Sequence, residues 1–517
     1  KPINAGIWRY HPVRHEFEIF AEGTSNPWGL DYDQYGEFFV TACVIPHLYH
    51  IVPGGRYQRQ AGQHFNPYTY DDIKTIADHA HYAGSARPDV AFDKTTGAGI
   101  VNDDTNALGG GHAHCGLAIY QSSLFPPTYR NQLIFGNLHG HRLVTNYTDP
   151  HASTYVGKHG SDFMRANDMH FIPVTQKVGP DGALYVSDWS DEQICHRGSN
   201  AVENWDRSNG RLYRVSYAGW KPWKGDLAKE SDEALAKLAV QTGNEWESRM
   251  ARRVLMERVY AEPRNGNATV IVSESSRYNP AASSAERLKS FWLRACGVMS
   301  GKETDLENRI TPVHLIEDAD EYVRGSIYRF LLQDREARMH AGYLFSWSAI
   351  AQRRDFFGKD VPAIPARAEK EKSPYVRRIL ASGLQYLKDY DERLKDLATA
   401  LLSHGEDKDD PMIPLLIWYG IEPLVGADPK VGLELARVSK LPKVTEFIYR
   451  RLSSDDEGRA SMLSELTKES DSAKREATLA MILSSARGAG KLTMPPDWAA
   501  TAVKLKAGGS GAGTTEQ

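Results

Sequence analysis

The sequence is poor in cysteine and contains no run that could cross a membrane. Its 517 residues include only Cys43, Cys115, Cys195 and Cys296, and none of them forms a C-x-x-C pair. This excludes a zinc ribbon and a C-x-x-C-H haem site, and a disulfide framework is not expected at this density. The apolar run at 411–425 (PMIPLLIWYGIEPLV) is shorter than the ~18–20 residues of a membrane span and contains Glu422.

The sequence also lacks an excess of positive charge. Its net charge of -4 gives no case for binding nucleic acid or an anionic membrane. A hydrophobic content of 41% with 25% charged residues is that of an ordinary soluble protein, and the length predicts two or three domains. The first residue is Lys1, so we expect a mature or cut fragment whose location cannot be read from a targeting segment.

Residues 1–217 have the pattern of a β-rich domain. Short runs of β-branched and aromatic residues alternate with turn signals such as Gly54-Gly55 and Pro180-Asp181-Gly182. The predicted strands are 36–44, 116–120, 132–135, 142–146, 183–187 and 211–216. Such strands favour a sandwich, barrel or propeller. A polar, aromatic-rich insertion covers about residues 56–111, and a connection that long is usually functional.

The pattern becomes helical after residue 217. Residues 220–226 (WKPWKGD) resemble a linker, and apolar residues then recur at i, i+3, i+4 spacing to about residue 506. The clearest predicted helices are 247–260, 321–332 and 375–387, and each opens with Arg in its first turn. We interpret 218–506 as an α-solenoid of HEAT or armadillo type, with a non-repetitive helical domain as the alternative. Residues 507–517 (AGGSGAGTTEQ) are predicted to be a flexible tail leading to a further segment.

The histidines indicate which half carries chemistry. Fifteen of the eighteen lie between His11 and His196, and histidine is both the common metal ligand and the usual proton-transfer group. The sharpest motif is residues 109–116 (GGGHAHCG), where His112 and His114 point to one side if the chain is extended and Cys115 to the other. It predicts a substrate, cofactor or metal site, or else a glycine-rich loop whose histidines bond to the backbone.

Three further segments carry candidate polar residues. Residues 137–142 (NLHGHR) follow a strand, so that His139 and Arg142 either bind an anion or a sugar hydroxyl or lie on a surface turn. Residues 162–170 (DFMRANDMH) place a carboxylate beside a histidine, as a base and its orienting partner would be. The acidic cluster at 188–192 is either a Ca²⁺ site or a solvated loop. His47 and His50 share a face only on a helical turn, and Cys195-His196 is a weak signal.

Residues 1–217 resemble the bacterial membrane-bound-dehydrogenase-like proteins abundant in planctomycetes and verrucomicrobia. The resemblance rests on residues 26–79, on GGGHAHCG, on YRNQLIFGNLHGHRL (129–143) and on KVGPDGALYVSDWSD (177–191). It implies a six-bladed glucose/sorbosone-dehydrogenase-like β-propeller, incomplete in this chain, that precedes HEAT-like repeats and usually a c-type cytochrome. It also implies a periplasmic or other extracytoplasmic location, with possible membrane association.

The resemblance implies roles for particular residues. A distant similarity to soluble quinoprotein glucose dehydrogenases implies pyrroloquinoline quinone with Ca²⁺ as cofactor. The expected catalytic residues are His112, His114 and His139, and the expected cofactor-binding residues are His141, Arg142, Pro46 and His47. The expected substrate-binding residues are Arg165, Asn167, Asp168 and His170. No metal ligand is assigned, and haem is not supported because the chain lacks C-x-x-C-H.

The sequence departs from the quinoproteins at two of these segments. Residues 169–174 (MHFIPV) contain no arginine, and residues 41–45 (TACVI) lack the acidic and glutamine residues of the calcium loop. The leading hypothesis is therefore a sugar or alcohol dehydrogenase that passes electrons to a cytochrome. The alternatives are a carbohydrate-binding propeller whose solenoid docks a protein partner, and a metal-dependent hydrolase.

Overall fold

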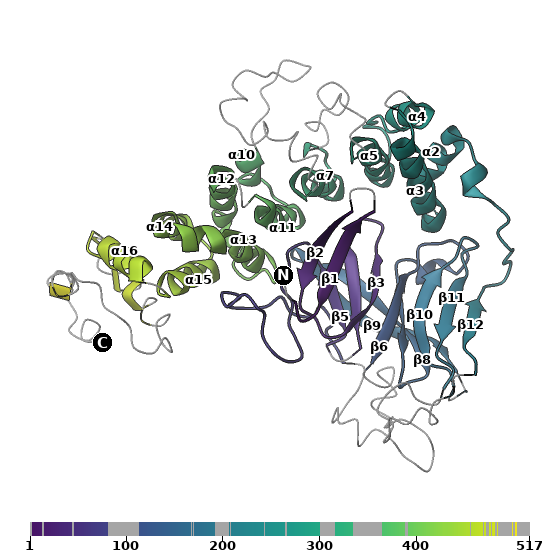
Figure 1. Cartoon of the computed structure of the whole chain (residues 1–517), viewed down its shortest axis with the longest axis horizontal. Helices are drawn as coiled ribbons and strands as arrows, with labels where there is room; N and C mark the ends of the chain where they lie inside the picture. Colours follow the sequence, from purple (N-terminus) through teal and green to yellow (C-terminus); the bar gives the residue numbers. More distant parts are fainter. Residues whose placement is uncertain are drawn as a thin grey trace, which may run out of the picture. The chain divides into compact units, whose positions relative to one another are not determined.

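The computed structural model describes a β-rich N-terminal part followed by a helical C-terminal part, as the sequence predicts (Figure 1). The described residues are 3–12, 15–43, 46–80, 113–166, 168, 170–191, 206, 208–241, 243–263, 266–299, 316–333, 364–387, 391–454 and 456–468, with short pieces beyond. His112, Asn167, the second half of the predicted insertion and the Gly/Ser tail lie outside them.

Within the described part of the chain, the strands form four antiparallel sheets in which neighbours in the sequence are neighbours in the sheet. The first is the hairpin of β1 (Gly6–His11) and β2 (Glu16–Glu22), and the second joins β3 (Pro27–Tyr32), β4 (Phe38–Ala42) and β5 (Leu48–Ile51). The third and fourth contain β6 (His114–Ile119), β7 (Leu133–Asn137), β8 (Arg142–His151) and β9 (Thr154–Arg165), then β10 (Pro173–Val178), β11 (Leu184–Asp188) and β12 (Arg211–Val215). All six strands expected from the pattern are confirmed within a few residues, since turn residues and alternation delimit them.

The first strands of the last three sheets lie against one another. Lys177 Nζ on β10 donates hydrogen bonds to Leu30 O of β3 and to Leu117 O of β6, at 3.1 and 3.3 Å. A Cβ on Gly29 would lie 2.2 Å from the backbone of Gly116, which shows how closely β3 approaches β6. Only glycine permits this approach. The three sheets are therefore arranged side by side, with these strands along their common inner edge.

Two apolar layers fill the spaces between these sheets. One face of the β6–β9 sheet contributes Phe135 and Val144, which pack with Phe39 and Leu48 of the β3–β5 sheet. The opposite face contributes Ile134 and Leu143, which pack with Leu184 and Val186 of the β10–β12 sheet. The alternation of side chains along a strand puts neighbouring residues on these two faces.

The helices begin after β12. They are α2 (Asp232–Val240), α3 (Glu245–Ala261), α4 (Asn267–Ser275), α5 (Ser284–Met299), α7 (Glu321–Gln333), α10 (Ile364–Ala368), α11 (Pro374–Gly383), α12 (Asp391–Leu402), α13 (Ile413–Ala427), α14 (Pro429–Val438), α15 (Pro442–Leu452) and α16 (Asp456–Leu466). Short 3₁₀ turns lie at Pro127–Tyr129 (η2), Leu227–Lys229 (η4), Leu384–Tyr386 (η6) and Gly405–Asp407 (η7). The three clearest helix predictions correspond to α3, to α7 and to α11 with its 3₁₀ extension η6, as the apolar periodicity indicates.

The chain is divided into two compact units. The first contains Lys1–Phe65 and Ile73–His340, so that helices α2–α7 pack with the sheets. Arg249 of α3 forms an ion pair of 3.0 Å with Asp31 at the end of β3 and lies 3.6 Å over the ring of Tyr32. Tyr322 of α7 stacks on Tyr35 with ring centroids 3.6 Å apart. These contacts anchor helices of the first unit to its β3–β4 turn.

The second unit contains Ala341–Gln517 and the short segment Asn66–Asp72. Its core helix is α13, which is the apolar run noticed in the sequence and is buried along most of its length. Trp418 Nε1 of α13 donates a hydrogen bond of 2.8 Å to Tyr68 O, and Tyr419 Oη donates one of 2.7 Å to Asp71 O. The ring of Tyr70 stacks on Trp418, under the guanidinium of Arg450. The helices of this unit thus hold a short peptide from the first half of the sequence, which turns at Asn66–Thr69. No helix among the described residues is long and apolar enough to span a membrane.

Candidate functional site

Four histidines meet between the β3–β5 sheet and the β6–β9 sheet. The ring of His47 lies 4.7 Å from that of His114 and 5.1 Å from that of His79, measured between centroids. The ring of His79 lies 5.4 Å from that of His159. Tilted and edge-on contacts of this kind are favourable for aromatic rings. The four side chains therefore form one continuous row, which we call the histidine row.

Each of these histidines is placed by local backbone structure. His47 precedes β5, and its carbonyl accepts a hydrogen bond of 3.0 Å from Ala42 N, which closes the turn after β4. His114 is the first residue of β6 and its side chain is wholly buried, like that of His47. Phe135 of β7 lies beside both rings, with centroids 6.0 and 5.6 Å away.

The other two histidines are placed by a chain segment that pairs with β9 in parallel. Residues 76–78 pair with Gly157, since Asp78 N donates to Gly157 O at 3.0 Å and Gly157 N to Ile76 O at 2.8 Å. This pairing brings His79 beside His159, two residues further along β9. Asp78 Oδ1 lies 2.8 Å from His79 Nδ1, so a carboxylate orients this imidazole. Such a partner fixes the tautomer and the orientation of a histidine ring.

One amide side chain is directed at the row. Asn146 of β8 lies opposite His159 in the register of β8 and β9, and it is wholly buried. Its Nδ2 lies 3.4 Å from His47 Nε2. The site therefore combines imidazole rings with a polar amide inside an otherwise apolar layer.

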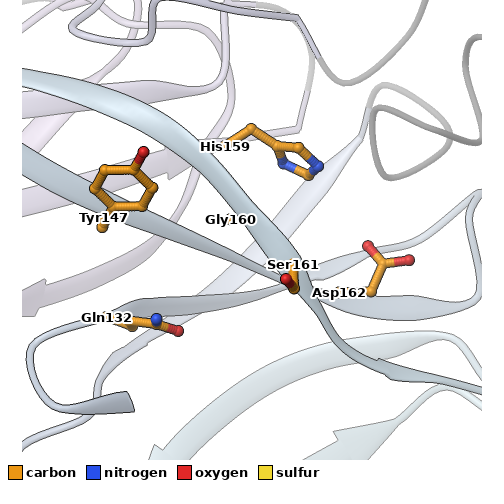
Figure 2. A pocket seen from close by; sticks show the side chains of 6 residues that line it. All are labelled: Gln132, Tyr147, His159, Gly160, Ser161 and Asp162. Atoms are coloured by element: carbon orange, nitrogen blue, oxygen red, sulfur yellow. The ribbon is translucent and has the colours of Figure 1, made fainter. Parts of the chain in front are cut away.

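A polar pocket of about 560 Å³ opens beside the row. His159 belongs to both, and the remaining lining residues are Gln132, Tyr147, Gly160, Ser161 and Asp162. Figure 2 shows them along β9, within β8 at Tyr147 and just before β7 at Gln132. Tyr147 is 42% exposed, which leaves an aromatic face available to a ligand. A pocket with one aromatic ring and several hydrogen-bonding groups suits a polyhydroxylated molecule.

The residues predicted for the site fall into separate groups. His47 and His114, expected to bind cofactor and to act in catalysis, are brought into contact in the histidine row. Pro46 lies next to His47 and is half-buried. His139 lies in the turn between β7 and β8, on the same connection as His141. His112 and Asn167 lie outside the described residues.

Arg142 and Arg165 gather at the carboxylate of Asp162. Arg142 Nη1 donates to Asp162 Oδ2 at 2.8 Å, and its Nε donates to Gly140 O at 3.0 Å. Arg165 Nε lies 3.9 Å from the same carboxylate oxygen. Burial lowers the pKa of Arg142, and the charge of Asp162 opposes this effect. The two arginines predicted for the site thus lie next to the pocket, because both approach Asp162 on its wall.

A third group surrounds Arg211 at the start of β12. This arginine donates hydrogen bonds to Asp168 Oδ2, Asp188 Oδ2 and His170 O, at 2.6–2.7 Å. Its side-chain hydrogen bond to Asp168 lowers the pKa of that carboxyl. The ring of His141 lies 3.1 Å from Phe171 O, and burial lowers its pKa, so this imidazole is neutral near pH 7.

Asp188, the first residue of the acidic cluster at 188–192, has a structural role. Its other oxygen accepts hydrogen bonds from Ile172 N and Ser190 N, at 2.7 and 3.1 Å. Its two oxygens therefore hold loops of the protein together. Among the described residues, no group of three or more His, Cys, Asp and Glu side chains is arranged to hold a metal ion. The hydrolase hypothesis stays a prediction, because His112 is not among these residues.

Sequence reasoning missed His159, Asn146 and the pocket residues. The polar run 158–162 (KHGSD) was the available signal, but it lies in a strand that was not predicted. His79 was noticed as part of the insertion and not as a member of the site.

Comparisons with known proteins match parts of the chain. The family model described as Domain of unknown function (DUF7133) matches residues 1–219. No curated protein matches the chain. A crystal structure described as an oxidoreductase (glucose dehydrogenase) from Thermus thermophilus is 21% identical over 38% of this chain and 47% of that one, with a TM-score of 0.24. Two further structures, both described as glucose dehydrogenase, are 17% and 16% identical, with TM-scores of 0.23 and 0.22.

These two structures are matched over 40% and 39% of this chain and over 49% and 43% of their own. The chain therefore spans somewhat less than half the length of the solved structures that it matches. At such TM-scores the likeness carries no argument about fold or activity.

Proposed function

We propose that this chain is a sugar or alcohol dehydrogenase of the glucose/sorbosone-dehydrogenase-like propeller type. The observation that carries the proposal is the polar pocket, which has His159 on its wall, Tyr147 beside it and the histidine row behind. Oxidation of a CH–OH group requires a base that takes the hydroxyl proton while the carbon-bound hydrogen leaves with two electrons. A histidine that lines a polyol-sized pocket meets the first requirement.

The residues then have distinct roles. Tyr147 supplies a face on which a sugar ring stacks, while Gln132, Ser161 and Asp162 bond to its hydroxyl groups. His159 accepts the proton of the carbinol that is oxidised. His79, oriented by Asp78, lies behind His159 and interacts with the imidazolium that forms. The carbon-bound hydrogen and its two electrons would pass to a separate two-electron acceptor, and a cytochrome is the proposed partner that would receive those electrons one at a time.

The residues expected to bind the quinone do not fit it. Pyrroloquinoline quinone bears three carboxylates, so with its Ca²⁺ it needs several cations and oxygen ligands. Of the expected residues, Arg142 is the one permanent cation, and its guanidinium already bonds to Asp162 and Gly140. His141 is held neutral by burial. The chain's own contribution is therefore substrate binding and proton removal.

We also propose that the sheets are the later blades of a six-bladed propeller and that the helices form a HEAT-type solenoid in an extracytoplasmic protein. The side-by-side packing of β3, β6 and β10 supports blades around a common axis. The exposed aromatic rings of Trp8, Tyr10 and Phe17 on the first hairpin support a further sheet packing there.

The test is a dye-reduction assay on the purified chain with a panel of aldoses, polyols and small alcohols. It is run with and without added quinone and Ca²⁺. His159→Ala is expected to lower turnover by about 10²–10⁴-fold, as loss of a general base does. His151→Ala, which removes an exposed histidine on the neighbouring strand, is the matched control and should retain activity. Turnover unchanged in His159→Ala would refute the assigned base, and no reduction with any substrate would refute the dehydrogenase.

A second candidate is a carbohydrate-binding module whose solenoid docks a protein. The specific observation is that α13 already holds the short segment Asn66–Asp72 through aromatic contacts and hydrogen bonds to its backbone. Calorimetric titration with the same sugars separates the candidates. Binding that Tyr147→Ala weakens about tenfold and Tyr147→Phe retains, without turnover, would favour the module.

A further inference from the structure

Two cysteines far apart in the sequence lie in contact beside the histidine row. Cys43 follows β4 and Cys115 is the second residue of β6, and their Sγ atoms are 3.0 Å apart. The residue before Cys115 is His114, and the turn that starts at Cys43 ends at His47. The pair thus bridges the β3–β5 sheet and the β6–β9 sheet next to the site.

The backbone holds the two residues at this separation. Cys43 N donates a hydrogen bond of 3.2 Å to Asn26 O, and Cys115 is paired with Gly136 in the register of β6 and β7. Thr41 Oγ1, two residues before Cys43, donates one of 2.9 Å to Gly116 O. Since both strands are fixed, closing the sulfurs to the ~2.05 Å of a disulfide requires side-chain adjustment rather than strand movement.

The surroundings of the two thiols differ in exposure. Cys115 is wholly buried in an apolar cluster with Ala113, Leu138 and Ile172, whereas Cys43 is half-buried at the edge of this cluster. The contact with the Cys115 thiol lowers the pKa of Cys43. Cys43 is therefore the thiol that a reagent can reach, and Cys115 is the one placed to react with it afterwards.

We propose that Cys43 and Cys115 form an intramolecular disulfide by exchange with a small-molecule disulfide, joining the two sheets that hold the histidine row. The Cys43 thiolate attacks a sulfur of oxidised glutathione, forms a mixed disulfide and releases one glutathione thiolate. The Cys115 thiolate then attacks the Cys43 sulfur and releases the second glutathione. Two protein thiols are oxidised, one glutathione disulfide is reduced to two thiols, and the two protons lost by the protein thiols end on the two glutathione thiolates.

A third cysteine that the structure describes provides an internal control. Cys296 of α5 donates a hydrogen bond of 3.3 Å to Trp292 O, and burial raises the pKa of its thiol to about 11. A thiol of this kind stays protonated and inert. It should remain reduced under conditions that oxidise the pair.

The test treats the full chain carrying Cys195→Ser with oxidised glutathione, alkylates the remaining thiols and maps the peptides without reduction. The expected result is a cross-linked peptide pair that contains Cys43 and Cys115, a mass loss of about 2 Da and alkylated Cys296. Oxidation should raise the melting temperature by about 4 °C or more, since the bond closes a long loop.

Matched variants make the outcome decisive. Cys296→Ser should leave the cross-link and the thermal shift unchanged. Cys43→Ser should abolish both, and Cys115 should then be recovered as a free thiol that carries no glutathione. Alkylation of Cys43 and Cys115 as free thiols after oxidation would overturn the proposal. A stable glutathione adduct on Cys43 without the cross-link would also overturn it, because Cys115 would then be unable to reach Cys43.

Discussion

Replacing Gly29 by alanine tests whether β3 packs against β6 as the structure describes. The added Cβ would lie 2.2 Å from both the carbonyl carbon and the oxygen of Gly116 and 2.5 Å from Thr41 Oγ1. Two of these atoms are backbone, so no side-chain rotation relieves the overlap. The strands would have to separate by on the order of 1 Å, and such overpacking costs about 1–3 kcal/mol.

Separation of the strands also has a hydrogen-bond cost. Thr41 Oγ1 donates to Gly116 O at 2.9 Å, and both groups are buried. Loss of this bond adds about 1 kcal/mol, so the total destabilisation is about 3 kcal/mol. Amide hydrogen exchange of peptides from β3 and β6 measures this loss of stability locally. The protection factors of their amides should fall about 100-fold.

The matched control is Gly210→Ala. A Cβ at Gly210 would make only ordinary contact, 3.7 Å from Asp188 O, and exchange in β3 and β6 should not change. If Gly29→Ala kept its protection within threefold of the original chain, β3 would not approach β6 this closely. The side-by-side arrangement of the sheets, and with it the propeller proposal, would then lose its main support.

Three further predictions concern other parts of the molecule. Burial, followed by the charge of Glu37, raises the pKa of Asp33 from 3.8 to about 7. The folded state therefore binds more protons than the unfolded state between pH 4 and 7, and stability falls as pH rises through that window. Asp33→Asn should raise the free energy of unfolding by about 1–3 kcal/mol at pH 8 and by much less at pH 4, and an unchanged pH profile in urea unfolding would contradict this. Asp407→Ala should destabilise the second unit by about 3–5 kcal/mol, because it leaves the buried Arg377 guanidinium without its bidentate partner at 2.6 Å. Glu434→Ala, which removes an exposed ion pair with Lys395, should cost less than about 0.5 kcal/mol. If calorimetry showed equal destabilisation by Asp407→Ala and Glu434→Ala, the buried ion pair would not contribute more than the exposed one. Tyr70→Ala should speed thermolysin cleavage within residues 60–80 about tenfold while Tyr70→Phe does not, because the ring stacks on Trp418; equal rates would show that the stack does not hold the segment.

Local patterns were sufficient to predict six of the twelve described strands and three of the described helices. Turn residues such as Pro180-Asp181-Gly182 delimit β10 and β11, and apolar spacing delimits α3, α7 and α11, because these signals act over a few residues. The Arg in the first turn of these helices was also visible, but its partners were not. Arg249 bonds to Asp31, whereas Arg377 bonds to Asp407, because the turns that face the two helices differ.

The concentration of histidines in the β-rich half and the order of strands before helices can be read from the sequence alone. Which of these histidines meet depends on how the sheets pack. His47, His79, His114 and His159 come from two sheets and from a segment that pairs with β9, and this pairing at Gly157 places His79. Cys43 and Cys115 were likewise unremarkable until the packing of β4 beside β6 brought their sulfurs together. The physical reason is that alternation along a strand specifies which face a side chain occupies, whereas the packing of sheets decides what that face meets.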